Sequence, residues 1–158
     1  GLTASAVEAG IPLSVHYPLS PKLHFTALIP PFELSTAHSR GVLPHDVPRA
    51  DAIFNVSRAA LLLSALGSGD IALLRAAMAD RLHEPYRRAL IDGYDTARGL
   101  AYKHGAEAMC ISGAGSTLLC VAAHPSLAED ISADLAAHLP GWRAVTLLPE
   151  LEGAHVEE

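Results

Sequence analysis

Aromatic residues and charged residues are both scarce in this sequence. Phe, Trp and Tyr make up 5% of the 158 residues and charged residues 18%, whereas 50% of the chain is hydrophobic. The 11 Lys and Arg residues are scattered and are outnumbered by 17 Asp and Glu residues. Because nucleic acids are bound through clustered positive charge, this composition argues against a nucleic-acid partner.

A long apolar run and a recognisable leader are also lacking. Apolar runs such as residues 59–66 fall far short of the ~20 residues that cross a bilayer. Residues 1–10 have neither the basic start nor the uninterrupted apolar centre of a secretory signal. We therefore expect a cytoplasmic protein without a membrane segment.

Cysteine is limited to Cys110 and Cys120, which lie in apolar runs on either side of a glycine-rich segment. Neither has a second Cys or a His at the spacing of metal ligands, so both are interpreted as small buried hydrophobic residues. The nine His residues form no HxxxH or HExxH pattern. The sequence therefore predicts no metal site.

The hydrophobic pattern predicts one α+β domain, which is the default for a chain of this length. Apolar residues recur at three- and four-residue steps and indicate a long helix: Ile53, Val56, Ala60, Leu63 and Leu66. A strand, turn, strand, helix, strand unit near the carboxyl end predicts an antiparallel sheet covered by helices on one face. The predicted strands are 11–17, 22–29, 108–111, 117–122 and 142–148, and the predicted helices are 35–43, 49–66, 70–81, 93–104 and 126–138, with Pro85 interrupting the chain between two of them.

The segment SGAGS, residues 112–116, is the most informative local motif. Two glycines one residue apart between strands allow the backbone to approach a ligand closely, although a purely structural turn is the commoner explanation. It is neither a Walker loop nor a dinucleotide-binding fingerprint, since no GKS or GKT follows and no third glycine opens a helix.

Two arginines stand in segments where a side chain can be presented to a ligand. Arg40 ends the short helix that starts at Ser35, and Arg87 lies close to Pro85. A guanidinium matches a carboxylate with a fork of donors, so a converging pair suits a small acid, whereas a single such arginine is usually a solvated surface residue. His83 and Glu84 could take acid–base roles but fit a capping or surface role better, and Asn55 is first a packing residue.

Taken in order, these segments resemble the carboxyl-terminal region of the homoserine kinases, which belong to the GHMP superfamily of small-molecule kinases. The resemblance runs along almost the whole chain. Two blocks, ST-x-x-x-R-x-x-LP and D-x-x-x-EPYR-x-x-L, are specific to homoserine kinases, and SGAGS resembles the third motif of the whole superfamily. The matching segments are FELSTAHSRGVLP at 32–44, AIFNVSRAALLLSAL at 52–66, DRLHEPYRRALIDGYDTAR at 80–98, GAEAMCISGAGSTLLCVA at 105–122 and GAHV at 153–156.

The resemblance implies a ferredoxin-like α+β sandwich over residues 1–158, with the extra helices of residues 35–80 packed beside it. Residues 1–10 are then a remnant of a preceding domain or a linker. It also implies transfer of the ATP γ-phosphate, with Mg²⁺, to the hydroxyl of L-homoserine in threonine biosynthesis. On this reading Arg40 and Arg87 bind the substrate carboxylate and Thr36 lies close to the substrate. The third motif, which supports the phosphate site, falls on Ser112, Gly113, Ala114, Gly115, Ser116 and Thr117.

Two departures from the family pattern matter. Ser116 occupies a position where the third motif usually has proline, and we expect the shape of the turn to survive because both glycines remain. The family's phosphate-binding loop and amino-terminal strands are not within these residues, so the resemblance places no catalytic residue or metal ligand in this chain. It implies that the missing amino-terminal half is a partner, that the chain alone is inactive, and that a homodimer is possible.

An alternative reading is a stand-alone module that binds an amino acid for regulation without catalysis, since converging arginines on a sandwich could do this alone. A mevalonate-type kinase is disfavoured because the two arginine blocks point to an amino-acid substrate.

Overall fold

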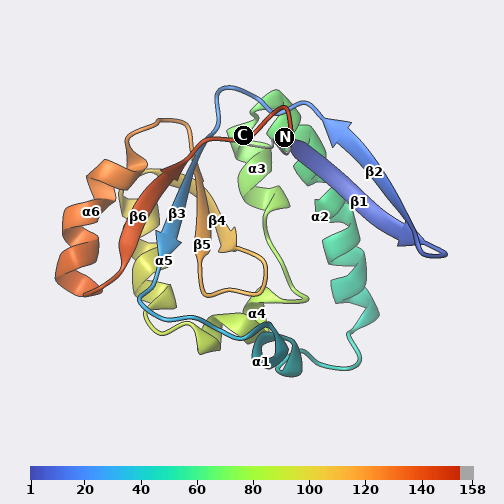
Figure 1. Cartoon of the computed structure of the whole chain (residues 1–158), viewed down its shortest axis with the longest axis horizontal. Helices are drawn as coiled ribbons and strands as arrows, with labels where there is room; N and C mark the ends of the chain where they lie inside the picture. The colour runs from blue at the N-terminus through green and yellow to red at the C-terminus, as the bar shows by residue number, and fades with distance from the viewer. Residues whose placement is uncertain (154–158) are drawn as a thin grey trace, which may run out of the picture.

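The computed structural model describes residues 1–153, and a four-stranded antiparallel sheet lies at its centre (Figure 1). The strands β4 (Ala106–Ile111), β5 (Leu118–Ala122), β3 (His24–Ile29) and β6 (Arg143–Leu147) lie side by side in that order. The two central strands are β5 and β3, and their register places Leu28 opposite Leu118. Every one of these strands falls within or overlaps a strand predicted from the sequence.

Each face of the sheet is covered by its own pair of helices. Side chains alternate along a strand, so Leu118 and Cys120 point to one face while Val121 points to the other. The first face packs on α5 (Tyr94–Lys103) and α6 (Leu127–His138), as expected for a ferredoxin-like sandwich. The second packs on α2 (Arg49–Ser68) and α3 (Ile71–Ala77).

Short polar side chains and a proline fix where several helices begin. The Ser35 hydroxyl accepts the amide N–H of His38 at 3.1 Å and caps α1 (Thr36–Gly41), as the sequence predicts. Asp70 caps α3 in the same way. Pro85 was expected to interrupt a helix, but it lies in the first turn of α4 (Glu84–Arg87), where its missing N–H costs no hydrogen bond. A 3-10 turn, Arg88–Leu90, follows.

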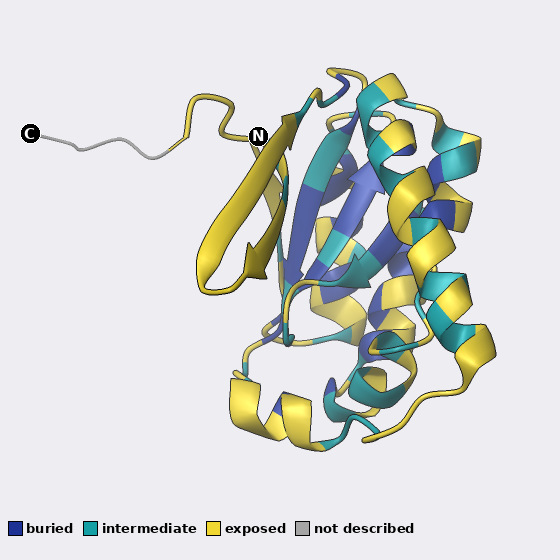
Figure 2. Ribbon diagram, turned by 90° about the vertical axis from the view of Figure 1, so that its right-hand side faces the viewer, coloured by how far each residue is buried: buried dark blue, intermediate teal, exposed yellow. Residues whose placement is uncertain are grey.

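The first 17 residues form a hairpin of β1 (Leu2–Glu8) and β2 (Ile11–Tyr17) that stands apart from the central sheet (Figures 1 and 2). The sequence predicted β2 but not β1, because Ser5 and the small residues around it give no strong strand pattern. The face that carries Ile11, Leu13 and Val15 is largely exposed. A two-stranded hairpin is at best marginally stable by itself.

The apolar stripe that identifies α2 in the sequence is only partly turned to the sheet. Ile53 and Val56 are 58% and 72% exposed, whereas Ala65 is buried and Leu62 and Leu66 pack against the sheet. Apolar residues lie on more than one side of this helix, so spacing alone could not choose the inner side. Within residues 1–153, α2 is the one helix long and apolar enough to cross a bilayer, and such a single helix is weak evidence for a membrane span.

Candidate functional site

Arg87 connects three segments that are far apart in the sequence. It ends α4, and its partly buried side chain reaches α1 and the turn between β4 and β5. Its Nε donates to the carbonyl of Ser39 at 3.1 Å, and its Nη1 donates to the carbonyl of Gly113 at 3.0 Å. The two predicted arginine segments and the glycine-rich motif therefore meet at one guanidinium.

The turn of residues 112–117 is closed by its own backbone. The amide of Ser112 donates to the carbonyl of Thr117 at 2.9 Å, and the amide of Gly115 donates to the carbonyl of Ser112 at 3.0 Å. Gly113 and Gly115 have φ angles of 57° and 91°, in the left-handed region that glycine adopts at little cost. The two glycines that the sequence singled out are thus required by the shape of the turn.

Ser116 is buried and holds this turn to the segment before α1. Its hydroxyl donates to the carbonyl of Phe32 at 2.7 Å. The side chain in the usual proline position therefore supplies an anchor of its own, in keeping with the expectation that the shape survives.

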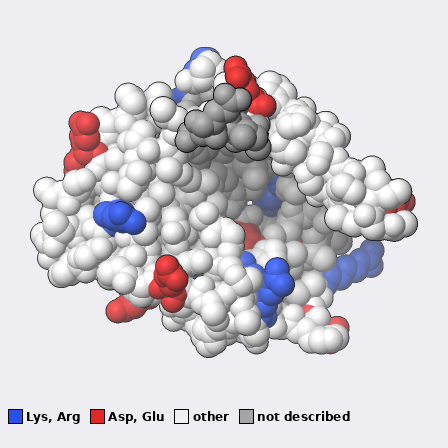
Figure 3. Space-filling model, viewed as in Figure 1, with Lys and Arg blue, Asp and Glu red and all other residues white. Residues whose placement is uncertain are grey.

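A cleft of about 240 Å³ opens beside Arg87. It combines a guanidinium with carboxylates and an imidazole, a set of groups that suits a small ligand carrying charges of both signs. Seen from the front, the protein surface is hollowed between the sheet and α2, with Lys or Arg side chains at the lower edge of the hollow (Figure 3). The cleft is lined by Asp80, His83, Glu84, Arg87, Cys110, Ile111 and Gly113.

The other two predicted substrate residues lie on α1. Thr36 is the first residue of this helix and Arg40 is in its last turn, and both are exposed. Arg40 follows Ser39, whose carbonyl binds Arg87, so the two arginine segments are neighbours in space. Within residues 1–153, the Arg40 guanidinium makes no hydrogen bond or ion pair, and its donors are free for a ligand.

Asp80 and Asn55 belong to the site region, although neither was predicted to bind a ligand. The Asp80 carboxylate accepts from the Asn55 amide at 2.6 Å and from three backbone amides at the start of α4. The sequence feature that could have identified Asp80 is its place in the block that contains Arg87, four residues before Glu84.

Glu84, interpreted as a capping or surface residue, accepts a hydrogen bond from the Tyr94 hydroxyl. Burial and this carboxylate raise the pKa of Tyr94.

Both cysteines are free thiols, and the predicted burial holds for Cys120 but only in part for Cys110. Cys120 is buried in the core, and Cys110 lies between the core and the cleft beside Arg87. No group of three or more His, Cys, Asp or Glu side chains that could hold a metal ion occurs within residues 1–153.

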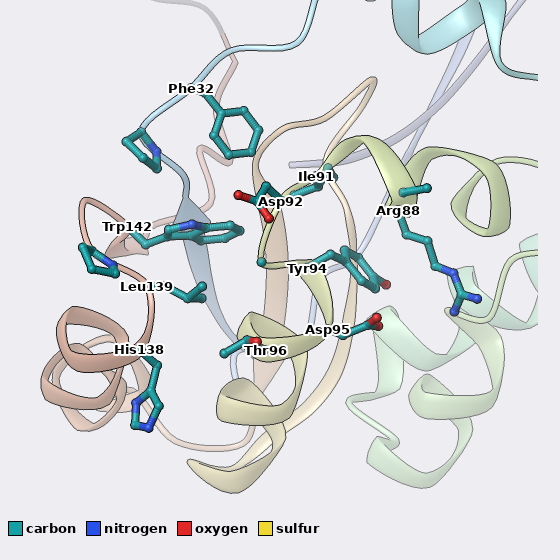
Figure 4. A pocket seen from close by; sticks show the side chains of 14 residues that line it. Phe32, Arg88, Ile91, Asp92, Tyr94, Asp95, Thr96, His138, Leu139 and Trp142 are labelled. Carbon is teal, nitrogen blue, oxygen red and sulfur yellow. The ribbon is translucent and has the colours of Figure 1, made fainter.

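A wider cleft of about 680 Å³ lies at the end of the sheet near α5 and α6, between Phe32 and Trp142 (Figure 4). Asp92 and Asp95 lie at its rim, and both are exposed. None of the predicted site residues lines this cleft, and it is widely open to solvent. We therefore assign the candidate site to the smaller cleft, which is lined by Arg87 and Gly113 of the predicted residues.

Comparison with known proteins shows the family of the chain. A family model described as the GHMP kinases C terminal matches residues 62–141. The homoserine kinase of Nostoc punctiforme is 44% identical over 131 residues, covering 82% of this chain and 41% of that protein. The homoserine kinase of Clostridium kluyveri is 37% identical over 142 residues, covering 87% of this chain and 47% of that protein.

The fold agrees as well. The crystal structure of homoserine kinase from Cytophaga hutchinsonii matches with a TM-score of 0.77 at 24% sequence identity, over 86% of this chain and 44% of that chain. The chain spans less than half the length of these relatives. Residues 154–156 of the closing GAHV segment lie outside the described residues. The chain belongs to the GHMP kinases and contains their carboxyl-terminal domain, in the form found in homoserine kinases.

Proposed function

We propose that the whole protein is a homoserine kinase, which transfers the γ-phosphate of ATP to the hydroxyl of L-homoserine and forms O-phospho-L-homoserine for threonine biosynthesis. The observation that carries this proposal is the position of Arg87, which joins the two substrate-binding blocks to the third motif. The kinase relatives named above support the reaction type. The residues described here supply the side of the site that recognises the amino acid.

The guanidinium of Arg87 keeps donors for a substrate carboxylate. An arginine side chain has five N–H donors. Backbone carbonyls take one at Nε and one at Nη1, so three donors remain for a carboxylate, one on Nη1 and two on Nη2. The two occupied donors hold the side chain in one orientation, which reduces the conformational entropy lost when a ligand binds. Arg40, exposed on the adjacent helix, supplies a second positive charge.

ATP and Mg²⁺ are the cofactors that this function implies. Phosphoryl transfer depends mostly on positioning and on stabilising the charge of the phosphates. No set of metal ligands occurs in the described part of the chain, so we assign no residue to Mg²⁺. The turn of residues 112–117 supports the proposal by placing backbone beside Arg87, where it can form a wall of the phosphate site.

We infer that the amino-terminal part of the kinase is the partner of the exposed apolar surface. This surface comprises one face of the β1–β2 hairpin, with Ile11, Leu13 and Val15, and the outer side of α2, with Ile53 and Val56. Hairpin and helix lie on the same side of the molecule (Figure 1). Apolar patches of this kind mark surfaces that are covered in the functional assembly.

The reaction tests the proposal directly. The whole protein and the 158-residue chain are each incubated with ATP, Mg²⁺ and L-homoserine, and ADP and phosphohomoserine are measured. We expect turnover by the whole protein and none by the chain alone. A whole protein that binds homoserine without phosphorylating it would favour the regulatory module instead.

A substrate analogue separates carboxylate recognition from chemistry. 3-Aminopropan-1-ol has the hydroxyl and the amine of homoserine but lacks the carboxylate. It should be a far poorer substrate, with a raised KM. Equal use of both alcohols would contradict the role given to the arginines.

A further inference from the structure

The Asp80 carboxylate is the centre of a hydrogen-bond network that joins α2 to the start of α4. One of its oxygens accepts from Asn55 Nδ2 at 2.6 Å and from the amide of Leu82 at 2.7 Å. The other accepts from the amides of His83 and Glu84, both at 2.9 Å. All four bonds are short and come from donors on two separate segments, so the carboxylate has little freedom to move.

Asn55 is equally constrained on α2. Its Nδ2 donates to Asp80, and its Oδ1 accepts the amide N–H of Arg81 at 2.9 Å. The side chain therefore holds two consecutive residues of the segment that leads into α4. A third link between the same elements is the ion pair of Arg81 with Asp51, at 3.2 Å.

Helix α4 depends on such an anchor because it is only four residues long. One helical turn is unstable by itself, since it fixes several backbone angles for very few hydrogen bonds. The first amides of a helix also lack partners within the helix. Asp80 supplies partners for the amides of His83 and Glu84, which stand at that start.

The same turn carries Arg87. The amide of Arg87 donates to the carbonyl of His83 at 3.0 Å, so the residue that bears the guanidinium is bonded to one that Asp80 holds. The guanidinium in turn binds the carbonyls of Ser39 and Gly113. A displaced start of α4 would shift the guanidinium relative to α1 and to the glycine turn.

Charge strengthens the anchor. The side chain of Asp80 is 20% exposed. Burial by itself would raise the pKa of this carboxyl, but the bonds from Asn55 and from the backbone of residues 82–84 lower it below its usual value. The carboxylate is therefore ionised at neutral pH, and hydrogen bonds to an ionised acceptor are stronger than those between neutral groups.

We propose that Asp80, held in place by Asn55, is a positioning residue that sets the location of the Arg87 guanidinium for the substrate carboxylate. The proposal rests on the function proposed above, in which Arg87 binds homoserine. Asp80 acts through the start of α4 and is not assigned any contact with the substrate or its phosphate.

Kinetics of the whole enzyme test the proposal with Asp80→Asn, which keeps the size of the side chain but loses the charge and one acceptor. Small displacements of a binding group reduce efficiency strongly, so we expect the KM for homoserine to rise about tenfold or more. The KM for ATP should stay within about twofold, because no nucleotide contact is assigned to this residue. Asn55→Ala should change the same constant in the same direction. Unchanged KM for homoserine in both variants would overturn the proposal.

Asp70→Ala is the matched control. Asp70 also caps a helix through its carboxylate, which accepts the amide of Leu73 at 2.9 Å, but it serves α3 and not α4. It should lower Tm without changing the KM for homoserine. If it raised KM as much as Asp80→Asn does, the effect would reflect general destabilisation, and the positioning role would be wrong.

The Arg87→Met background separates this inference from the proposed function. If Asp80 acts through Arg87, Asp80→Asn should raise KM no further in that background, because the interaction that it positions is already gone. Independent, additive effects would exclude positioning through Arg87. If Arg87→Met alone leaves KM unchanged, the proposed carboxylate role fails first, whatever Asp80 does.

Discussion

Replacing Arg87 with Met in the whole enzyme removes two distinct sets of interactions. Met keeps an unbranched apolar side chain but no donor. It therefore deletes the hydrogen bonds to the carbonyls of Ser39 and Gly113 as well as the fork offered to the substrate. The variant should lose both folding stability and affinity for the substrate. The structure allows the two losses to be estimated separately.

The loss of stability follows from the two backbone contacts. The bond to Gly113 is exposed and the bond to Ser39 is only partly buried, so we take the typical value of about 1 kcal/mol for each hydrogen bond and about 2 kcal/mol together. For about 150–250 residues, that corresponds to a Tm lower by about 4–8 °C, and the shift is smaller in a longer chain. Differential scanning calorimetry of the variant and the parent measures it.

The loss of affinity follows from the substrate carboxylate. A hydrogen bond to a charged group contributes about 1.5–3 kcal/mol, which corresponds to a KM for homoserine raised about 10- to 150-fold. Arg40→Met should give a comparable rise in KM with little change in Tm, because the exposed Arg40 is not bonded within the described residues. Arg88→Met, another exposed arginine one residue after Arg87, should change neither quantity.

Comparing Tm and KM among the three variants shows whether Arg87 has a specific role. If Arg87→Met keeps its Tm, the bridge to α1 and to the glycine turn does not stabilise the protein. If KM responds to Arg88→Met as strongly as to Arg87→Met, the effect is one of general charge and not of a specific fork.

Two further predictions concern the turn and the cysteines. Ser116→Ala leaves the partly buried carbonyl of Phe32 without its partner, so urea unfolding should show a loss of about 1–2 kcal/mol, and an unchanged midpoint would show that the hydroxyl does not anchor the turn. Burial raises the pKa of the Cys110 thiol to about 11 and that of the Cys120 thiol to about 12, so both are protonated and unreactive near neutral pH. Ellman's reagent should label the folded chain slowly and the denatured chain fully, whereas rapid labelling of the folded chain would contradict this.

Local signals in the sequence predicted most of the fold. Ser35 starts α1 as expected, and apolar runs on either side of SGAGS give β4 and β5. Sequence spacing did not show which side of a helix packs against the sheet. The stripe of Ile53 and Val56 has ideal helical spacing, yet α2 turns its other side, with Ala65, to the sheet. Spacing tells which residues share a face but not which partner that face meets.

Individual residues of the candidate site could be predicted from the sequence, but the contacts between them could not. Arg87 and the glycine turn could each be singled out from residue type, whereas their contact through the carbonyl of Gly113 depends on tertiary structure alone. Asp80 was missed because a single aspartate before a proline-containing turn has many ordinary roles. Its importance becomes visible only when the three amides it accepts from are seen together.

The order of strands in the central sheet bears on how fast the protein folds. The middle pair joins β3 from the start of the chain to β5 from its last third, with Leu28 opposite Leu118. Closing so long a loop has an entropic cost that precedes any gain from packing, so this step should be slow. Helix α1 follows β3 and the glycine turn precedes β5. The substrate pocket therefore cannot assemble early from a local fragment, because it needs this long-range pairing.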